Sequence, residues 1–438
     1  MPLASIVQAA GIALLGAQLG PFHAAQLVVI LFAGLVPLAT YLAARSLGVA
    51  ERGALLAAFF SGMGGLFAPA WVTLDSYGLA ALLGTLFFLS FARAAATGDA
   101  RAGALAGLAI GLLFLARAEA ALLGLAPLAL AAGARTRAAG VAGSALALAI
   151  GIAWLARNAA LGPSDLLARS ALLVRYEDLF AQREPTLDAF LAAGPAVVAA
   201  RAGALGANAI TFLFAFALLP VVGMVTGARA LWPKAEVRAY VALALLVFLA
   251  QSLVWTLHST RGSYVHSLAA FLPFGFALAA AGGQALLDRR AIGVRTLALA
   301  AALAGCLAMS IAALVQFDAT YGATERARRA ALDAVPAGPF LAIDASAWRW
   351  IADRPVVVTP ADGLEAAACA VGSYGARAVV LEPAHFSAYD QLYQGSAGVP
   401  WLGPPIDRGG IRIYPVRGEV VCTPRRVYAD TVVGASMP

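Results

Sequence analysis

The sequence contains few charged residues. They make up 12% of its 438 positions, whereas hydrophobic residues make up 62%. Soluble proteins carry about 25% charged residues, so this chain cannot cover a globular surface with polar groups. The shortage excludes a soluble enzyme, a disordered chain and a fibrous protein, and it predicts a polytopic membrane protein.

Lysine and cysteine are also scarce. Lys234 is the one lysine among 30 basic residues, and the net charge is +7. The basic residues fall mostly in short loops between apolar runs, which sets membrane orientation and predicts no binding of nucleic acid. Cys306, Cys369 and Cys422 show no zinc-ligand spacing, so we predict neither a metal site nor a cofactor. Cys369 and Cys422 could pair outside the cytoplasm, although two free, buried thiols are favoured.

Eight apolar runs are long enough to cross about 30 Å of hydrocarbon. They cover residues 24–44, 53–70, 74–92, 137–158, 205–227, 237–257, 264–286 and 293–316. Residues 3–19 are apolar but short, and residues 102–132 are too long for one span. With the longer of these counted as a hairpin, the sequence predicts about 10–11 membrane helices.

Arg117 and Glu119 interrupt the long apolar run at 102–132. If the chain turns back there, the basic loops on both sides of the run share one face of the membrane. These loops contain Arg45, Arg52, Arg93, Arg101, Arg135, Arg137, Arg229, Lys234, Arg238, Arg289, Arg290 and Arg295. Because positive loops mark the cytoplasmic side, we predict a short helical hairpin whose turn is extracytoplasmic.

Four polar segments then lie on the outer face. They are residues 69–75, 159–204, 258–263 and the tail from 318 onward. In the second segment Leu166, Leu173, Tyr176 and Phe180 recur at helical spacing. This pattern predicts either an amphipathic helix at the membrane surface or a helix that caps the bundle.

The composition changes after the apolar domain 1–316. In the domain 317–438, short β-rich runs alternate with helical stretches, at residues 340–344, 346–352, 356–359, 364–374, 378–382 and 411–416. The pattern predicts a small extracytoplasmic α/β domain with some parallel pairing. This domain contains no nucleotide-binding loop and no nucleophile elbow, so we expect it to have a structural or docking role.

Several segments have a recognisable pattern when read in order. They are LVPLATYLAARSLG at 35–48, LAGLAIGLLFLARAE at 105–119, GIAWLARNAALGP at 151–163, VRYEDLF at 174–180 and RGSYVHSLAAFLP at 261–273. Together they resemble motifs of polyprenyl-phosphate-sugar glycosyltransferases of the GT-C superfamily. Within that superfamily, they resemble the dolichyl-phosphate-mannose–protein mannosyltransferases (glycosyltransferase family 39) and the aminoarabinose transferases. Their order along the chain is more specific than any one motif.

The resemblance implies that a sugar passes, with inversion, from a polyprenyl-phosphate carrier to a lipid, glycan or protein acceptor. The reaction would occur on the outer face of the bacterial cytoplasmic membrane. In such proteins a carboxylate of the first outer loop deprotonates the attacking hydroxyl. Here Met1, Pro2 and Leu3 stand where the stretch after that loop is expected, and residues 1–50 contain no Asp or Glu. We therefore expect the first span and its acidic loop to be absent.

Two other acids are candidates for the absent carboxylate. Asp75 and Glu119 are the acidic residues of the first three outer turns. Asp75 could act in the cavity or merely favour the start of a helix through the helix dipole. Glu119 could orient the phosphate or sugar, or simply mark a solvated turn.

Five residues are candidates for binding the donor phosphate. They are Arg117, Arg157, Arg261, Tyr264 and His266. Guanidinium and imidazole groups bind phosphate well, and charges within spans usually face a cavity or one another. Arg157 could instead extend to the lipid headgroups.

Three functions fit the sequence to different degrees. We favour a membrane glycosyltransferase. One alternative is a non-catalytic or truncated GT-C-like protein that binds lipid-linked sugar as an accessory subunit, which the missing acids favour. The other is a transporter or flippase, against which we find no evident inverted repeat.

Overall fold

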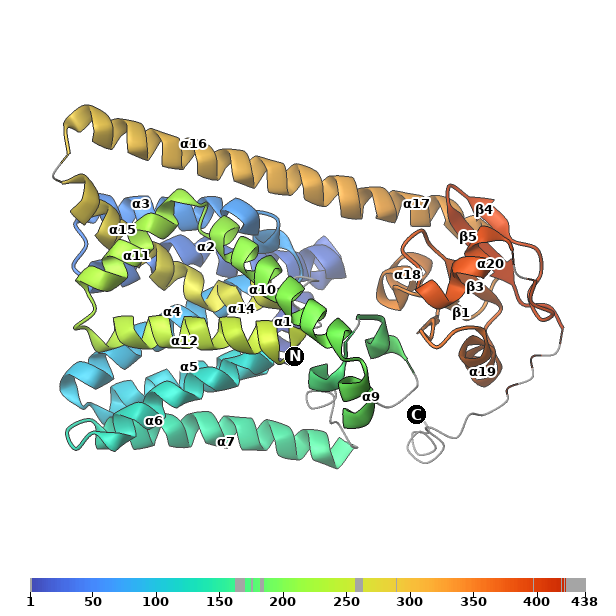
Figure 1. Ribbon diagram of the computed structural model, residues 1–438, viewed down its shortest axis with the longest axis horizontal. Helices are drawn as coiled ribbons and strands as arrows, with labels where there is room; N and C mark the ends of the chain where they lie inside the picture. The colour runs from blue at the N-terminus through green and yellow to red at the C-terminus, as the bar shows by residue number, and fades with distance from the viewer. Residues whose placement is uncertain are drawn as a thin grey trace. The chain divides into compact units, whose positions relative to one another are not determined.

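The computed structural model describes residues 2–161, 170–174, 176–181, 185–256, 263–288, 290–396, 398–418, 420 and 422. The chain forms two compact units (Figure 1). The first, the bundle unit, comprises Met1–Leu167 and Arg201–Gln316, and the second, the tail unit, comprises Ala168–Ala200 and Phe317–Pro438. The bundle unit is helical, and the tail unit contains the sheet.

Eight helices in the described residues are long and apolar enough to cross a membrane, or up to nine if a bent pair counts as one span. They are α1 (Pro2–Leu19), α2 (Pro21–Ser46), α4 (Tyr77–Thr97), α7 (Arg137–Leu161), α10 (Pro195–Ala215), α12 (Ala235–Leu253), the stretch Ser263–Leu287 and the helix that begins with α16 (Ile292–Phe317). The predicted class, a polytopic α-helical membrane protein with a small α/β domain, is confirmed.

The bent pair consists of α3 (Glu51–Met63) and the short turns η1 (Gly65–Phe67) and η2 (Ala70–Val72). The two parts meet at 42°. Gly64 between them has a φ of 79°, which L side chains rarely adopt. The bend interrupts the predicted span 53–70, and it leads the chain into the turn before α4.

Glycines bring α5 (Ala100–Ala116) against α7. A Cβ atom added at Gly103 would lie 2.0 Å from the carbonyl oxygen of Ala139, and one at Gly107 would lie 2.0 Å from that of Gly143. The two backbones therefore touch, as small residues allow in membrane bundles. Since both contact positions advance by four residues, α5 and α7 run in the same direction.

The next helix, α6 (Leu125–Ala132), runs the opposite way. Gly140 of α7 approaches Ala131, and Gly143 approaches Pro127, so α6 is antiparallel to α7 and hence to α5. The turn η3 (Ala118–Gly124) joins α5 to α6, and the backbone at Arg117 is extended between them. The predicted hairpin is confirmed.

The predicted span 205–227 is wrong as a single helix. Helix α10 ends at Ala215, and α11 (Leu219–Ala230) begins after a break. Ala217 and Leu218 have positive φ values of 51° and 61°, a conformation that cannot continue an α-helix. A proline in the first turn of α11 fits a helix start.

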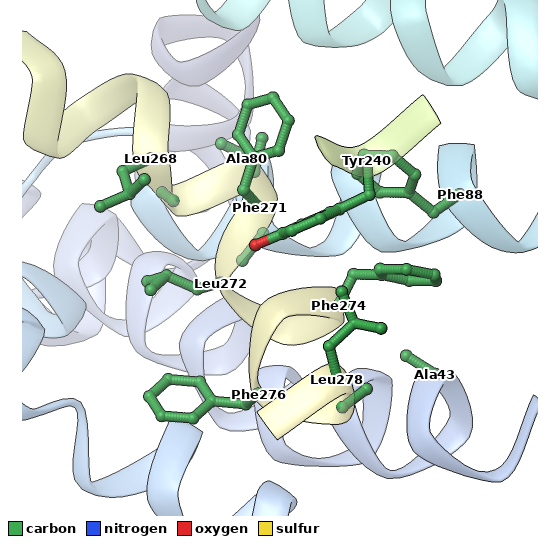
Figure 2. Packing of buried hydrophobic residues seen from close by; sticks show 14 of the residues in the cluster. Ala43, Ala80, Phe88, Tyr240, Leu268, Phe271, Leu272, Phe274, Phe276 and Leu278 are labelled. Atoms are coloured by element: carbon green, nitrogen blue, oxygen red, sulfur yellow. The ribbon is translucent and has the colours of Figure 1, made fainter. Parts of the chain in front are cut away.

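Aromatic packing fixes α4 against the stretch 263–287, which consists of α14 (Ser263–Leu268), η5 (Ala269–Phe271) and α15 (Leu272–Leu287). Figure 2 shows Phe88, Tyr240 and Phe274 meeting in the core; the ring centroids of Phe88 and Phe274 lie 4.9 Å apart. A Cβ atom at Gly84 would lie 2.0 Å from the carbonyl oxygen of Ala270. This close approach aligns the beginnings of α4 and α14.

The tail unit contains a five-stranded sheet in the order β2-β1-β3-β5-β4. Its strands are β1 (Phe340–Ala342), β2 (Val356–Val358), β3 (Ala378–Leu381), β4 (Ile406–Arg408) and β5 (Ile411–Pro415). Strand β1 pairs in parallel with β2 and β3, whereas β5 pairs antiparallel with β3 and β4. The parallel pairing predicted for this domain is confirmed, and β4 was not predicted.

Helices cover both faces of this sheet. They are α17 (Ala323–Ala331), α18 (Ala345–Ala352), α19 (Leu364–Tyr374) and the short α20 (Asp390–Gln394). Successive residues of one strand pack into different cores: Val379 lies in a cluster with Phe386, and Val380 lies in a cluster with Trp348. This two-sided burial explains the continuous apolar runs of the strands.

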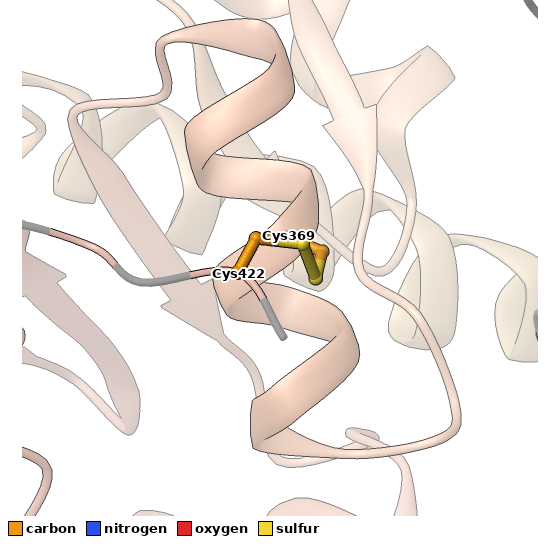
Figure 3. The surroundings of a disulfide bond; sticks show 2 residues. All are labelled: Cys369 and Cys422. Atoms are coloured by element: carbon orange, nitrogen blue, oxygen red, sulfur yellow. A yellow bond between two sulfur atoms is a disulfide. The ribbon is translucent and has the colours of Figure 1, made fainter. Parts of the chain in front are cut away.

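A disulfide joins Cys369 of α19 to Cys422, 53 positions later (Figure 3). The expectation of two free thiols is therefore wrong, because the fold of the tail unit brings the chain beyond β5 back to α19. Cys306 is buried as a free thiol in α16.

The segment 159–204 is not one amphipathic helix where it is described. Leu166 lies outside the described residues, and Tyr176–Phe180 form a short 3-10 helix, η4. The carbonyl oxygen of Phe180 accepts a hydrogen bond of 3.0 Å from the backbone N–H of Ala361, and its ring lies 5.4 Å from that of Phe386. This part of the segment therefore packs within the tail unit, followed by α9 (Leu187–Ala192).

Candidate functional site

Asp75 lies in the turn between η2 and α4. Its Oδ1 accepts hydrogen bonds from the backbone N–H of Ser76, at 2.6 Å, and from the Ser76 hydroxyl, at 3.2 Å. The turn is tight, since the backbone N–H of Asp75 donates to the carbonyl of Thr73. Local hydrogen bonds within the turn therefore hold the carboxylate, in addition to its contacts with residues distant in the sequence.

Arg117 and His266 complete a three-residue cluster with Asp75. Arg117 donates from Nη2 to Asp75 Oδ1 and from Nε to Ser76 Oγ, the latter at 2.8 Å. His266 Nδ1 lies 3.1 Å from Asp75 Oδ2 and also contacts Arg117 Nη2. The cluster joins three parts of the bundle: the turn before α4, the end of α5 and α14.

Tyr77 fixes the other side of the histidine ring. Its hydroxyl lies 3.0 Å from His266 Nε2, and the two rings are stacked with centroids 4.5 Å apart. If Nδ1–H donates to Asp75, Nε2 is the acceptor of a neutral imidazole and the Tyr77 hydroxyl donates to it. Asp75 then selects the tautomer, and Tyr77 holds the plane of the ring.

The surroundings of Asp75 favour its charged form. Burial alone raises its pKa, but the hydrogen bond with His266 and the charge of Arg117 outweigh burial and hold the pKa of this carboxyl well below its ordinary value. Asp75 is therefore ionised at neutral pH. A carboxylate of lowered pKa is a weak proton acceptor.

Glu119 lies in η3 and is positioned by a separate chain of hydrogen bonds. The Ser267 hydroxyl donates to Glu119 Oε1 at 2.7 Å, and Gln251 Nε2 donates to Ser267 Oγ at 3.2 Å. Glu119 borders a small cleft together with two members of the cluster. The lining residues are Ala80, Leu113, Arg117, Glu119, Ala120, Leu123, Val247, His266, Ser267, Ala270 and Phe271.

The remaining candidates lie elsewhere. The Arg157 guanidinium stacks over Trp154, 4.8 Å from the ring centroid, and donates to Asn158. Tyr264 is buried and packs edge-on against Phe248, so the structure brings neither residue into the cluster. Arg261 lies outside the described residues.

Sequence reasoning missed Ser76, Tyr77, Gln251 and Ser267. Ser76 and Tyr77 directly follow Asp75 in the predicted outer turn, so their position next to a candidate residue could have indicated them. Gln251 is an amide within an apolar span, and intramembrane polar residues usually have a functional or packing partner. In the described part of the chain, no group of three or more His, Cys, Asp or Glu side chains is arranged to hold a metal ion.

The chain has the fold of the GT-C glycosyltransferases, so the predicted resemblance is confirmed at the level of the fold. It is similar to ArnT from Cupriavidus metallidurans, solved in the apo state and bound to undecaprenyl phosphate, with TM-scores of 0.54 and 0.56. Each match has 14% sequence identity and covers 94% of this chain and 87% of ArnT. Scans of family models and of curated proteins give no match.

Proposed function

We propose that this protein is a membrane glycosyltransferase that moves a sugar from a polyprenyl-phosphate donor to an acceptor on the outer face of the bacterial cytoplasmic membrane. The observation that carries the proposal is the cluster of Asp75, Arg117 and His266, two members of which, Arg117 and His266, border a cleft at the ends of apolar helices. A donor with a membrane-dissolved tail must present its phosphate at such a boundary. The undecaprenyl phosphate in one ArnT structure supports this ligand class.

Arg117 is suited to hold the phosphate. Its hydrogen bonds within the described chain use Nε and Nη2, so Nη1 can donate to an anion in the cleft. A hydrogen bond from a charged guanidinium to a phosphate oxygen is about twice as strong as one between neutral groups. His266 also lines the cleft and is held in place there by Asp75 and Tyr77 through its two ring nitrogens.

The disulfide supports an outer location for the tail unit. Disulfides form and persist in oxidising compartments such as the periplasm, and Cys369 and Cys422 are paired. The positions of the basic loops favour the same orientation. The Asp75 turn and the hairpin turn at Arg117 then face the same compartment as the tail unit.

Binding of the donor's lipid phosphate tests the proposal directly. Purified full-length protein in nanodiscs is titrated with undecaprenyl phosphate, and transfer is measured with radiolabelled undecaprenyl-phosphate-linked hexoses and pentoses and acceptors extracted from bacterial envelopes. We expect Arg117→Ala to weaken binding at least about tenfold and to abolish transfer, because an anion would lose its main cationic partner.

Arg93→Ala is the matched control, because Arg93 is 72% exposed and pairs with Asp99 away from the cleft. It should leave binding and transfer within about twofold of the unmodified protein. Unchanged binding in Arg117→Ala would contradict the phosphate site.

A second function, binding of lipid-linked sugar without transfer, is favoured by one observation. Asp75 is engaged through both carboxylate oxygens and has a lowered pKa, so it suits a binding role better than proton transfer. An accessory subunit of this kind would bind undecaprenyl phosphate through Arg117 but release no labelled sugar from any donor.

A further inference from the structure

We infer that the two carboxylates of the site have different tasks: Glu119 accepts the proton of the acceptor hydroxyl, and Asp75 positions Arg117 and His266 for the lipid phosphate. The inference rests on the proposed function and deepens it. Its starting point is that Glu119 lines the cleft, as Arg117 and His266 do, whereas Asp75 contacts those two residues but does not line the cleft.

A chain of buried donors sets the orientation of Glu119. Gln251 is 4% exposed and Ser267 is 5% exposed. Ser267 has one hydroxyl proton and two acceptors within reach, Glu119 Oε1 at 2.7 Å and the carbonyl of Ser263 at 3.4 Å. The shorter contact takes the proton, and the lone pairs of Ser267 accept from Gln251 Nε2. Helix α12 thus fixes, through α14, the carboxylate of η3.

This arrangement leaves one side of the Glu119 carboxylate for substrate. In the described chain its hydrogen bonds engage Oε1 alone, so Oε2 can accept from a hydroxyl placed in the cleft. Asp75 differs, because its Oδ1 accepts hydrogen bonds from Ser76 and Arg117 and its Oδ2 pairs with His266. Both oxygens of Asp75 are therefore already used by the cluster, whereas the hydrogen bonds of Glu119 within the described chain leave Oε2 for a substrate hydroxyl.

In the transfer step, the hydroxyl oxygen of the acceptor attacks the anomeric carbon of the sugar while the hydroxyl proton passes to Glu119. The bond between the anomeric carbon and the phosphate oxygen breaks, and the electron pair leaves with the polyprenyl phosphate. Arg117 lines the same cleft, where its guanidinium stabilises that leaving charge. Glu119 afterwards returns its proton to water.

The decisive experiment compares Glu119→Gln with Asp75→Asn in the nanodisc assays of transfer and of undecaprenyl phosphate binding. Glu119→Gln should lower kcat about 100-fold or more, the usual contribution of general base catalysis, without weakening affinity for undecaprenyl phosphate. Asp75→Asn should weaken that affinity about tenfold, because Arg117 and His266 lose their common partner. Glu51→Gln, on an exposed helix start, is the matched control and should change neither.

Ser267 provides the test of positioning. Ser267→Ala removes the hydrogen bond that orients Glu119. We expect kcat to fall about tenfold with little change in the donor KM. Ser267→Thr keeps the hydroxyl and should restore the unmodified kcat. The other ionisable groups on the cleft, Arg117 and His266, are unchanged in both variants.

The outcomes separate the inference from the proposed function. If the unmodified protein transfers sugar, full transfer by Glu119→Gln contradicts the inference alone. The inference alone is also contradicted if Glu119→Gln loses as much affinity for undecaprenyl phosphate as Asp75→Asn does. An unmodified protein that binds undecaprenyl phosphate but transfers no sugar contradicts both transfer and the proton-accepting task of Glu119. Failure to bind undecaprenyl phosphate at all contradicts the phosphate site. Size-exclusion profiles confirm that each variant is folded.

Discussion

Each unit of the protein contains an arginine held by a carboxylate, but the two arginines are suited to different roles, one to stability and the other to binding. In the tail unit, Arg328 donates from Nε and Nη2 to the two oxygens of Glu382 and from Nη1 to Asp344, each at 2.8 Å. Trp348 donates its indole N–H to Glu382 at 2.5 Å. The cluster joins α17, α18 and the end of β3, and each of the three guanidinium nitrogens of Arg328 donates a hydrogen bond to a carboxylate.

The arginine of the bundle unit is only partly engaged. Arg117 shares the Asp75 carboxylate with His266, and its side chain is 20% exposed against 10% for Arg328. Arg117 borders a cleft, whereas Arg328 is buried and shares Glu382 with the indole N–H of Trp348. A buried ion pair is thus more typical of structure when every guanidinium nitrogen has a protein partner, as in Arg328, and of a binding site when one nitrogen has none in the described chain and the residue lines a cleft, as in Arg117.

The largest effect on stability should come from breaking the cluster of Arg328 and Glu382 in the tail unit. Glu382→Ala leaves Arg328 buried without its main partner, which typically costs about 3–5 kcal/mol. Hydrogen exchange of the full-length protein should show loss of protection in β3 and α18, with undecaprenyl phosphate binding retained. Unchanged protection would show that Asp344 alone suffices for Arg328 and would weaken the contrast between the clusters.

Lysine substitution of the two arginines should separate their roles. Lysine has no planar fork, so Arg117→Lys cannot serve Asp75, Ser76 and a phosphate together, and transfer should fall about 10- to 100-fold. Arg328→Lys should lower the unfolding temperature of the tail unit without changing the affinity for undecaprenyl phosphate. Equal activity losses in the two variants would contradict the distinction.

The response to pH should be smaller and should appear only in acid. The pKa of Asp75 is lowered in the folded protein, so its stabilising contribution is present above the unfolded value of about 3.9 and is lost as pH falls through the folded pKa. The difference in unfolding free energy between unmodified protein and Asp75→Asn should stay constant from pH 8 to about pH 5. Denaturant titrations in detergent at several pH values measure it, and a decline near pH 6 would contradict the assignment.

Arg157→Ala should have the smallest effect. The guanidinium lies over Trp154 and bonds to Asn158, and an exposed pair of this kind contributes roughly 0–1 kcal/mol. Transfer and undecaprenyl phosphate affinity should remain within about twofold of the unmodified protein. A tenfold loss would place Arg157 in the substrate site together with Arg117.

Local patterns predicted much of the fold. The apolar strands of the tail are visible in the sequence because each packs on both faces of the sheet, as Val379 and Val380 do. Strand β4 was missed because two of its three residues, Asp407 and Arg408, are charged and exposed at the sheet edge. The break at Ala217 and Leu218 was missed because neither residue type marks a positive φ.

The site was predicted residue by residue, and not as a cluster. Asp75, Arg117 and His266 stand out as charges at the ends of apolar runs, but 42 and 149 positions separate Arg117 from its two partners. Their meeting depends on tertiary packing such as the contact of Gly84 with Ala270. Ser267 was hidden for the same reason, because only the fold places it beside Glu119.

The disulfide between Cys369 and Cys422 also determines how the tail unit bears a mechanical load. A pull on the chain beyond Cys422 reaches α19 through the covalent bridge, because Cys369 lies in that helix. The antiparallel edge formed by β4 and β5 lies between the two cysteines in sequence and is therefore bypassed by the force. Strands at an edge otherwise separate one hydrogen bond at a time, so this bridge makes the end of the sheet resistant to peeling.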